Sequence, residues 1–206
     1  MTTVPTRAAA LARLTVGLAA ALGGAACGLG WTEGPWAAWG FGAACLLQTP
    51  SALNVIWRLR EGLGNQGLER ERLIHRGLGI ALRLLALGLA LGAASDLAHE
   101  TARRTTDLQL GLQAAAFPLA AALALAKRGL REVHPTLGLD GDRARVLAEL
   151  AALFLAGGLL GRWFPWADAA TALVLALRLF MEGQTLARGT TLPVACGGCG
   201  SGCGCG

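Results

Sequence analysis

The sequence predicts an all-α membrane protein with six transmembrane helices and with both termini in the cytoplasm. The chain is 54% hydrophobic and only 15% charged, with a mean hydropathy of +0.51, whereas a soluble domain carries about 25% charged residues. The charged residues fall into short clusters between long apolar runs. A helix needs about 20 mostly apolar residues to cross a bilayer, so these runs favour membrane spans over a soluble core.

The clearest element is a hydrophobic hairpin over Ala144–Arg188. Two apolar runs, Val146–Leu160 and Ala167–Met181, flank the short turn Gly161–Trp166, which reads GRWFPW. Tryptophan and related aromatic side chains are enriched where acyl chains meet water. An aromatic turn between two apolar runs therefore predicts a membrane hairpin.

The remaining runs complete six spans rich in glycine and alanine, which let membrane helices approach closely. Residues Met1–Gly30 also have the basic start and apolar run of a signal peptide. Because a second hydrophobic segment follows at once, we expect a retained first span instead. Pro50 and Pro118 interrupt two of the spans, which a membrane bundle tolerates. The expected spans are Ala8–Leu29, Trp36–Trp57, Leu73–Ala94, Leu108–Ala126, Val146–Leu160 extended at both ends, and Ala167–Ala187.

The distribution of basic residues predicts the orientation of these spans. Loops rich in Lys and Arg stay on the cytoplasmic side of a membrane, which places both termini in the cytoplasm and the chain in the cell membrane, with the bacterial inner membrane as the expected location. One side carries Arg7, Arg13, Arg58, Arg60, Arg70, Arg72, Arg76, Lys127, Arg128, Arg131, Arg143, Arg145 and Arg188, and the other carries Arg103, Arg104 and Arg162.

Several function classes are disfavoured. The isoelectric point near 9.2 and the net charge of +5 are typical of nucleic-acid-binding proteins, but such proteins need a continuous basic face with stacking aromatic residues. In this sequence the arginines lie mostly in short segments between apolar spans. We find no nucleophile–base pair, no phosphate loop and no paired His/Glu zinc motif, so an enzyme is not expected. No functional role is assigned to the isolated histidines His75, His99 and His134.

A cysteine-rich tail is the most specific chemical feature. Residues 192–206 form a low-complexity segment that we expect to be flexible and separate from the membrane domain of residues 1–191. Thiolates bind Zn²⁺ and other soft ions tetrahedrally, and the reducing cytoplasm favours ligation over disulfides. Cys27 and Cys45 lie in apolar runs and are expected to be inert. The predicted metal ligands are Cys196, Cys199, Cys203 and Cys205.

Polar residues inside the spans are a second set of candidates, because such residues are costly in a bilayer and mark ion paths. Gln48, Ser51 and Asn54 follow at intervals of three residues in the second span. They therefore share one helix face. We predict that this face lines a transport path.

Charged residues of the later spans extend this set. Arg145 and Glu149 are i,i+4 neighbours in the fifth span, and Arg178 and Glu182 are i,i+4 neighbours in the sixth. Arg145 and Glu149 are assigned to the transport path, while Arg178, Glu182 and the deeper Arg83 are assigned to structural ion pairs. The alternative to a functional role is structural. In that case each i,i+4 pair is an ion pair near a helix end whose long side chains reach the membrane interface. For Arg83, Glu149 is a candidate partner.

Two stretches resemble the cation diffusion facilitator family. Residues Gly138–Thr191, with a polar entry, a Trp-rich turn, the run WADAATALVLALRLFMEGQTL and a closing arginine, resemble that family's last two spans. The basic segment Gly62–Glu71, GLGNQGLERE, resembles its Gly-His-Gly-Lys/Arg-x-Glu segment. The resemblance implies a homodimer that exports divalent metal ions, usually Zn²⁺, in exchange for protons.

The resemblance also implies a metal site of carboxylates and histidine spaced i,i+4 on the second and fifth spans. At these places the present chain offers Arg145 and Glu149 on the fifth span and the three polar residues Gln48, Ser51 and Asn54 on the second. The family's cytoplasmic C-terminal domain is replaced by the cysteine tail.

Three functional hypotheses follow. The first is a membrane cation transporter that exports Zn²⁺ or another divalent or soft metal ion by proton exchange. The second is a transport-inactive relative that acts as a metal-binding or structural subunit of a larger membrane complex, in which Arg145 and Glu149 form a bundle-locking ion pair. The third is a carrier for an anionic or organic solute, with Arg83 and Arg178 as its binding cations.

Overall fold

The computed structural model describes residues 3–61, 68–101, 105–129 and 135–188 of the 206-residue chain. Over these ranges the chain forms six helices and no strand, which confirms the predicted all-α fold. The helices are α1 (Thr3–Glu33), α2 (Trp36–Glu61), α3 (Leu68–Ala98), α4 (Asp107–Arg128), α5 (Pro135–Leu160) and α6 (Ala167–Arg188).

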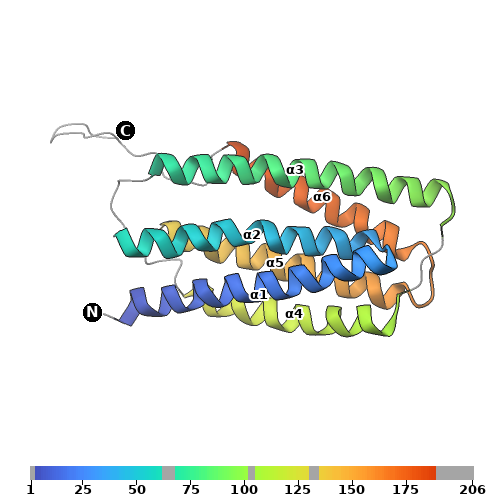
Figure 1. Ribbon diagram of the computed structural model, residues 1–206, viewed down its shortest axis with the longest axis horizontal. Coiled ribbons are helices and arrows are strands. Elements are labelled where there is room, and N and C mark those ends of the chain that lie inside the picture. Colours follow the sequence, from blue (N-terminus) through green and yellow to red (C-terminus); the bar gives the residue numbers. More distant parts are fainter. Residues whose placement is uncertain (1–2, 62–67, 102–104, 130–134, 189–206) are drawn as a thin grey trace, which may run out of the picture.

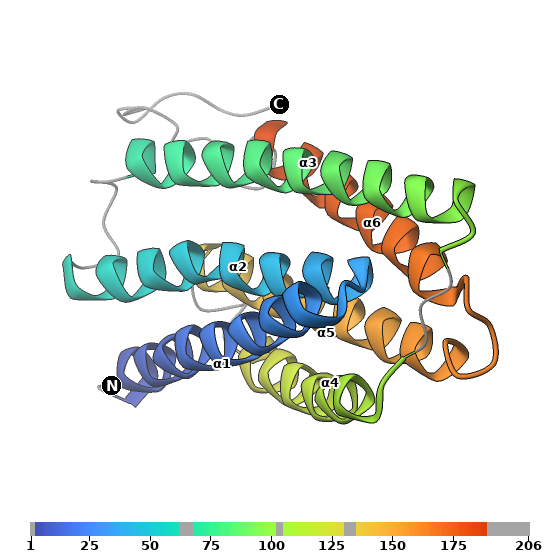
Figure 2. The ribbon, with the colours of Figure 1, turned by 45° about the vertical axis from the view of Figure 1, so that its right-hand side comes forward.

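The six helices form an up-and-down bundle of three layers. Figure 1 shows α3 with α6, α2 with α5, and α1 with α4, and the turned view in Figure 2 shows the same order. Consecutive helices run in opposite directions, so α1 begins and α6 ends at the same end of the bundle. The helices α2 and α5 therefore occupy the middle layer, where they can position polar groups inside the bundle.

Four helices are long and apolar enough to cross a membrane: α1 from Thr6, α3 from Glu69, α4 and α6. This supports the predicted membrane character. Over their described residues, the middle-layer helices α2 and α5 do not meet the same criterion. Both carry polar side chains along their length, and their central position keeps many of these inside the bundle.

The helices extend beyond the predicted spans at the basic end. The helix α2 continues to Glu61, α3 begins at Leu68 instead of Leu73, and α5 begins at Pro135 instead of Val146. Residues expected in basic loops, such as Arg70 and Arg143, are therefore helical. A helix continues past its apolar run as long as its backbone bonds are satisfied, so hydropathy alone underestimates its length. At the other end the predicted turn is confirmed, because α5 ends at Leu160 and α6 begins at Ala167.

Short connections and close helix crossings make the bundle compact. Gly34 has φ +79°, the left-handed conformation that ends a helix, and its N–H donates to Gly30 O at 2.9 Å. At the crossing of α3 and α6, a Cβ on Gly79 would lie 2.7 Å from Gly183 O. The missing side chains thus allow the two backbones to meet. In the middle layer, Phe41 and Phe154 stack with ring centroids 4.8 Å apart.

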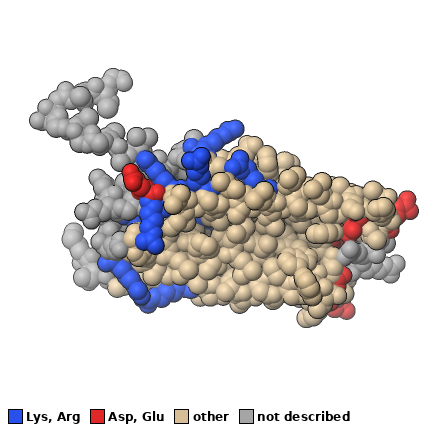
Figure 3. Space-filling view, turned by 45° about the horizontal axis from the view of Figure 1, so that its top comes forward, with Lys and Arg blue, Asp and Glu red and all other residues tan. Residues whose placement is uncertain are grey.

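The two ends of the bundle differ in charge. Figure 3 shows Lys and Arg side chains gathered toward one end of the visible face, while the opposite end carries Asp and Glu and a broad uncharged zone lies between them. The basic end is the one where α1 begins and α6 ends. A membrane protein with a basic cytoplasmic side has this charge distribution.

At the acidic end, a side chain of α6 caps the start of α2. The Trp36 N–H donates to Asp168 Oδ2 at 3.0 Å, and Asp168 is only 7% exposed. A carboxylate at a helix N-terminus binds a free N–H and interacts favourably with the helix dipole. Asp168 thereby connects the start of α6 to the start of α2.

We expect Asp168→Ala to lower the free energy of unfolding by about 1–2 kcal/mol, because it removes this cap and leaves a donor unpaired. Denaturant titration of the purified protein in detergent measures the change. Glu100→Ala, at an exposed acidic position of the same end, is the control and should change the stability by less than about 0.5 kcal/mol. Equal effects of the two substitutions would contradict the capping role.

Candidate functional site

The interior of the bundle toward its basic end contains an unusual number of ionisable side chains. Each is at most 7% exposed, although buried charges are stable in proteins only when they are paired or hydrogen-bonded. They come from α2, α3, α4 and α5, so several helices contribute to one polar interior. The residues are Arg58, Glu71, His75, Lys127, Asp140 and Arg143.

Two buried ion pairs connect neighbouring helices in this interior. Arg58 Nε of α2 lies 3.5 Å from Glu71 Oε2 of α3, and both side chains are at most 1% exposed. Lys127 Nζ of α4 lies 2.6 Å from Asp140 Oδ2 of α5. Removal of one partner from such a pair leaves an uncompensated buried charge. These pairs therefore fix how α2, α3, α4 and α5 meet at the basic end.

Arg143 is the least satisfied of the buried groups. It is 5% exposed, and none of its three guanidinium nitrogens has a hydrogen-bond partner among the described residues. The carboxylates of Glu182, Asp140 and Glu71 attract it electrostatically. Its guanidinium is thus a cation held among carboxylates from α3, α5 and α6.

Arg143 also lines a small cavity between the helices. Gln48 of α2 and Glu182 of α6 supply the cavity's other polar side chains, and leucines of α3, α5 and α6 supply much of its apolar wall. The volume is about 20 Å³, enough for about one water-sized group. The cavity lies between α2, α3, α5 and α6.

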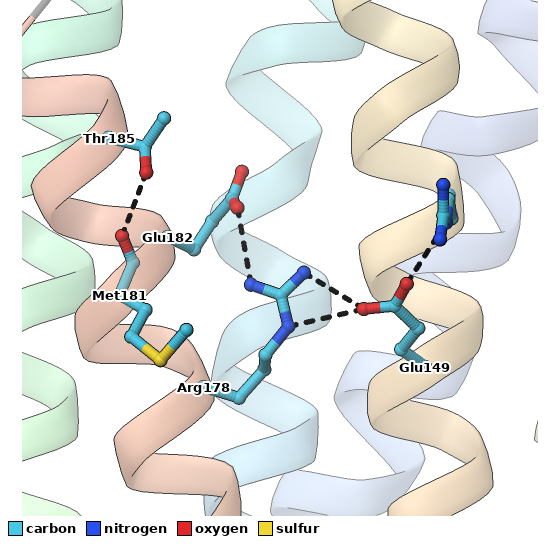
Figure 4. A network of polar contacts seen from close by, with 6 residues as sticks. Glu149, Arg178, Met181, Glu182 and Thr185 are labelled. Atoms are coloured by element: carbon cyan, nitrogen blue, oxygen red, sulfur yellow. Dashed lines mark hydrogen bonds and ion pairs between the residues drawn. The ribbon is translucent and has the colours of Figure 1, made fainter.

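A second polar network continues from this cavity to the surface between α5 and α6. Arg178 Nε and Nη2 donate to Glu149 Oε2 at 3.1 and 2.9 Å, and Arg178 Nη1 lies 3.5 Å from Glu182 Oε2. Figure 4 shows Arg178 lying between the two carboxylates, with Glu182 on its own helix and Glu149 on the neighbouring one. Arg145 Nε donates to Glu149 Oε1 at 3.1 Å. A continuous chain of charged groups thus runs from the cavity to the bundle surface.

The structure separates the residues predicted to line a transport path. Gln48 lines the cavity, and Ser51 and Asn54 are buried on the same face of α2. The Glu149 side chain is 39% exposed and lies where α5 meets α6, whereas the Arg145 side chain is 75% exposed on the surface. Arg145 therefore does not line the bundle interior, which corrects its assignment to an interior path.

The inward face of α5 explains this difference. Its fully buried apolar residues, Leu147, Leu150 and Phe154, fix which side of the helix packs against the bundle. The i,i+4 pair on that side is Arg143 and Leu147, two positions before Arg145 and Glu149. Neither a guanidinium nor a leucine binds a divalent cation, so this inward i,i+4 pair lacks the ligands that the family resemblance implies.

The predicted structural ion pairs are found in part. Arg178 and Glu182 interact as expected and also join Glu149 to the network. Arg83 makes no ion pair with any residue that the structure describes, and its side chain packs near Gly183 at the crossing of α3 and α6. Glu149, its predicted partner, binds Arg178 and Arg145 instead.

Two further predictions concern metal binding and histidines. The tail ligands Cys196, Cys199, Cys203 and Cys205 lie outside the described residues, as does His134. Over the four described ranges, no group of three or more His, Cys, Asp or Glu side chains could hold a metal ion. His75 is buried in the polar interior, a position that no sequence pattern predicts.

The sequence analysis did not predict that most of the ionisable residues of the polar interior are buried. Arg58, Glu71, Lys127 and Arg143 all fall in stretches expected to be basic loops, so their charge was used only to orient the chain. One signal was present in α5: counting back by three and four residues from Leu150 through Leu147 reaches Arg143 and then Asp140. That periodicity places both residues on the same helix face as Leu147 and Leu150.

The polar interior contains both cationic and carboxylate side chains in similar numbers. Arg58 pairs with Glu71 and Lys127 pairs with Asp140 in this interior, and leucines line much of the cavity wall. No model of a known protein family matches the sequence, and no curated protein matches it.

Proposed function

We propose that the chain is a six-span membrane transporter of cations that moves a divalent or soft metal ion in exchange for protons. The observation that carries the proposal is the set of buried ionisable side chains of α2, α3, α4 and α5, because such side chains in a membrane bundle mark ion and proton paths. A purely structural bundle gains more stability from apolar residues in such positions.

The six-span topology is supported by the lengths and directions of the helices. The 26-residue helices α2 and α5 extend about 39 Å each, more than the hydrocarbon thickness of about 30 Å. They alternate in direction with the four apolar helices that surround them. If those four cross the membrane, α2 and α5 cross with them, and the basic end faces the cytoplasm.

The proposed path begins at the basic end and passes the internal cavity. Glu182 is the carboxylate that lines this cavity, and Gln48 adds an amide oxygen. Arg143 sits among these groups as a tethered cation. A transported cation must displace its guanidinium, so we infer that transport requires a rearrangement of α5 relative to α6.

The buried position of Arg143 also favours a second candidate, a transport-inactive membrane subunit. A permanent interior cation repels a divalent ion, and the pairs Arg58–Glu71 and Lys127–Asp140 would then only lock the bundle. In this alternative the cysteine tail binds metal without transport. In the transporter it captures Zn²⁺ or another soft ion on the cytoplasmic side.

Zinc-driven proton movement in proteoliposomes tests the proposal. We expect flux with the intact chain, reduced flux after truncation behind Leu192, and loss of flux in Glu182→Gln, because this change removes the carboxylate that lines the cavity. Glu69→Gln changes an exposed carboxylate of α3 and should transport normally. Absence of flux for zinc and other divalent ions, with metal still retained by the intact chain alone, would support the inactive subunit instead.

A further inference from the structure

A second polar pocket opens on the outer surface between α4 and α5. Its volume is about 360 Å³, within the range of small-ligand pockets, about 300–1,000 Å³. Two exposed arginines and one aspartate provide its charged groups. The lining residues are Ala124, Leu125, Arg128, Gly141, Asp142 and Arg145.

We propose that this pocket binds the phosphate head group of an anionic phospholipid from the leaflet at the basic end of the bundle. The proposal rests on the membrane placement of the chain and not on transport. It assigns a role to Arg145, which the internal path does not use.

The two arginines suit a phosphate ligand. The Arg145 side chain is 75% exposed and uses Nε to bind Glu149, which holds its guanidinium in place. Arg128 is exposed on the other side of the pocket, at the last residue of α4. Guanidinium groups bind phosphate oxygens through paired hydrogen bonds. With Asp142 included, the pocket carries a net charge of +1, which favours an anion.

The level of the pocket along the bundle fits a lipid head group. The helix α4 has 22 residues and extends about 33 Å, close to the hydrocarbon thickness. Its last residue, Arg128, therefore lies at the membrane interface. Leu125 is one turn deeper and 68% exposed, where it can contact an acyl chain. Basic pockets between membrane helices on the cytoplasmic side bind anionic head groups.

Gly141 gives the pocket its depth. A Cβ built on Gly141 would meet the backbone of Lys127 at 3.6 Å, an ordinary contact distance. A Cβ can therefore be added here without forcing α4 and α5 apart. This position permits a variant that fills the pocket and leaves both arginines in place.

Native mass spectrometry of the purified full-length chain tests the proposal. Phosphatidylglycerol is titrated beside phosphatidylcholine and inorganic phosphate, and we expect retention of phosphatidylglycerol alone. Arg128→Gln with Arg145→Gln should weaken its binding about thirty-fold, because each charge near an anionic surface contributes roughly a fivefold change. Gly141→Leu should weaken binding by occluding the site, whereas Asp142→Asn should strengthen it by removing a repelling carboxylate.

Arg60→Gln is the matched control, since Arg60 is exposed at the same end of the bundle but lies outside the pocket. Equal loss of binding in Arg60→Gln would overturn the proposal in favour of diffuse attraction to the basic end. Equal binding of inorganic phosphate would overturn the lipid as ligand. Unchanged lipid binding in both Gly141→Leu and the double arginine variant would overturn the site. Zinc flux is measured separately, so failure here does not bear on transport.

Discussion

Glu71→Ala is expected to lower the free energy of unfolding by about 3–5 kcal/mol, the cost of leaving a buried charge without its partner. The substitution removes the carboxylate that lies 3.5 Å from Arg58 Nε, at a site where both side chains are at most 1% exposed. Denaturant titration in detergent measures the change. Because the pair joins α2 to α3, we expect the basic end of the bundle to open first.

Glu69→Ala is the control for this experiment. Glu69 lies two residues earlier on α3 and is exposed, so its loss should change the stability by less than about 0.5 kcal/mol. The double variant Arg58→Met with Glu71→Leu replaces both charges by apolar groups and should recover most of the stability. A small effect of Glu71→Ala, equal to that of Glu69→Ala, would show that the pair is not buried as the structure describes.

Gly79→Ala is expected to have the second-largest effect, a loss of about 1–3 kcal/mol, which is typical of overpacking. The added Cβ would lie 2.7 Å from both Gly183 O and Ala187 N. These are backbone atoms of α6 and cannot rotate away, so α3 and α6 must separate. The shift would also disturb Arg83, which packs beside Gly183.

Gly88→Ala provides a matched comparison on the same helix. A Cβ on Gly88 meets no atom within 4 Å, and alanine is a better helix former than glycine. We expect its stability to be unchanged or slightly higher in the same denaturant titration. A similar loss in both variants would mean that helix propensity, and not the α3–α6 crossing, determines the effect.

The sequence was sufficient to predict the hairpin and the number of helices. Long apolar runs separated by charged or aromatic turns leave few alternatives, and the turn Gly161–Trp166 was located correctly. The ends of the helices could not be predicted in this way. Hydropathy reports where a helix is apolar, whereas α3 and α5 continue through charged residues, of which some, such as Glu71 and Arg143, are buried and others, such as Glu69 and Arg145, are exposed.

The candidate site was harder to predict, because it depends on which side of each helix faces inward. The i,i+4 pair Arg145–Glu149 was identified correctly as a pair. Its orientation depends on the packing of Leu147 and Leu150, and in a membrane helix the outward face is apolar as well. The hydropathy pattern therefore does not distinguish inward from outward, and Arg143 was missed.

Cysteine labelling of intact cells with a membrane-impermeant reagent tests the six-span topology, on which the proposed function and the lipid site both depend. Single cysteines are introduced into a background without native cysteines. We predict that Thr32→Cys, Thr101→Cys and Trp163→Cys, all exposed at the acidic end, are labelled from outside. Arg60→Cys and Arg128→Cys at the basic end should react only after the membrane is opened. Labelling of the Arg60 position from outside together with the Thr32 position would show that α2 does not cross the membrane, and would contradict the account.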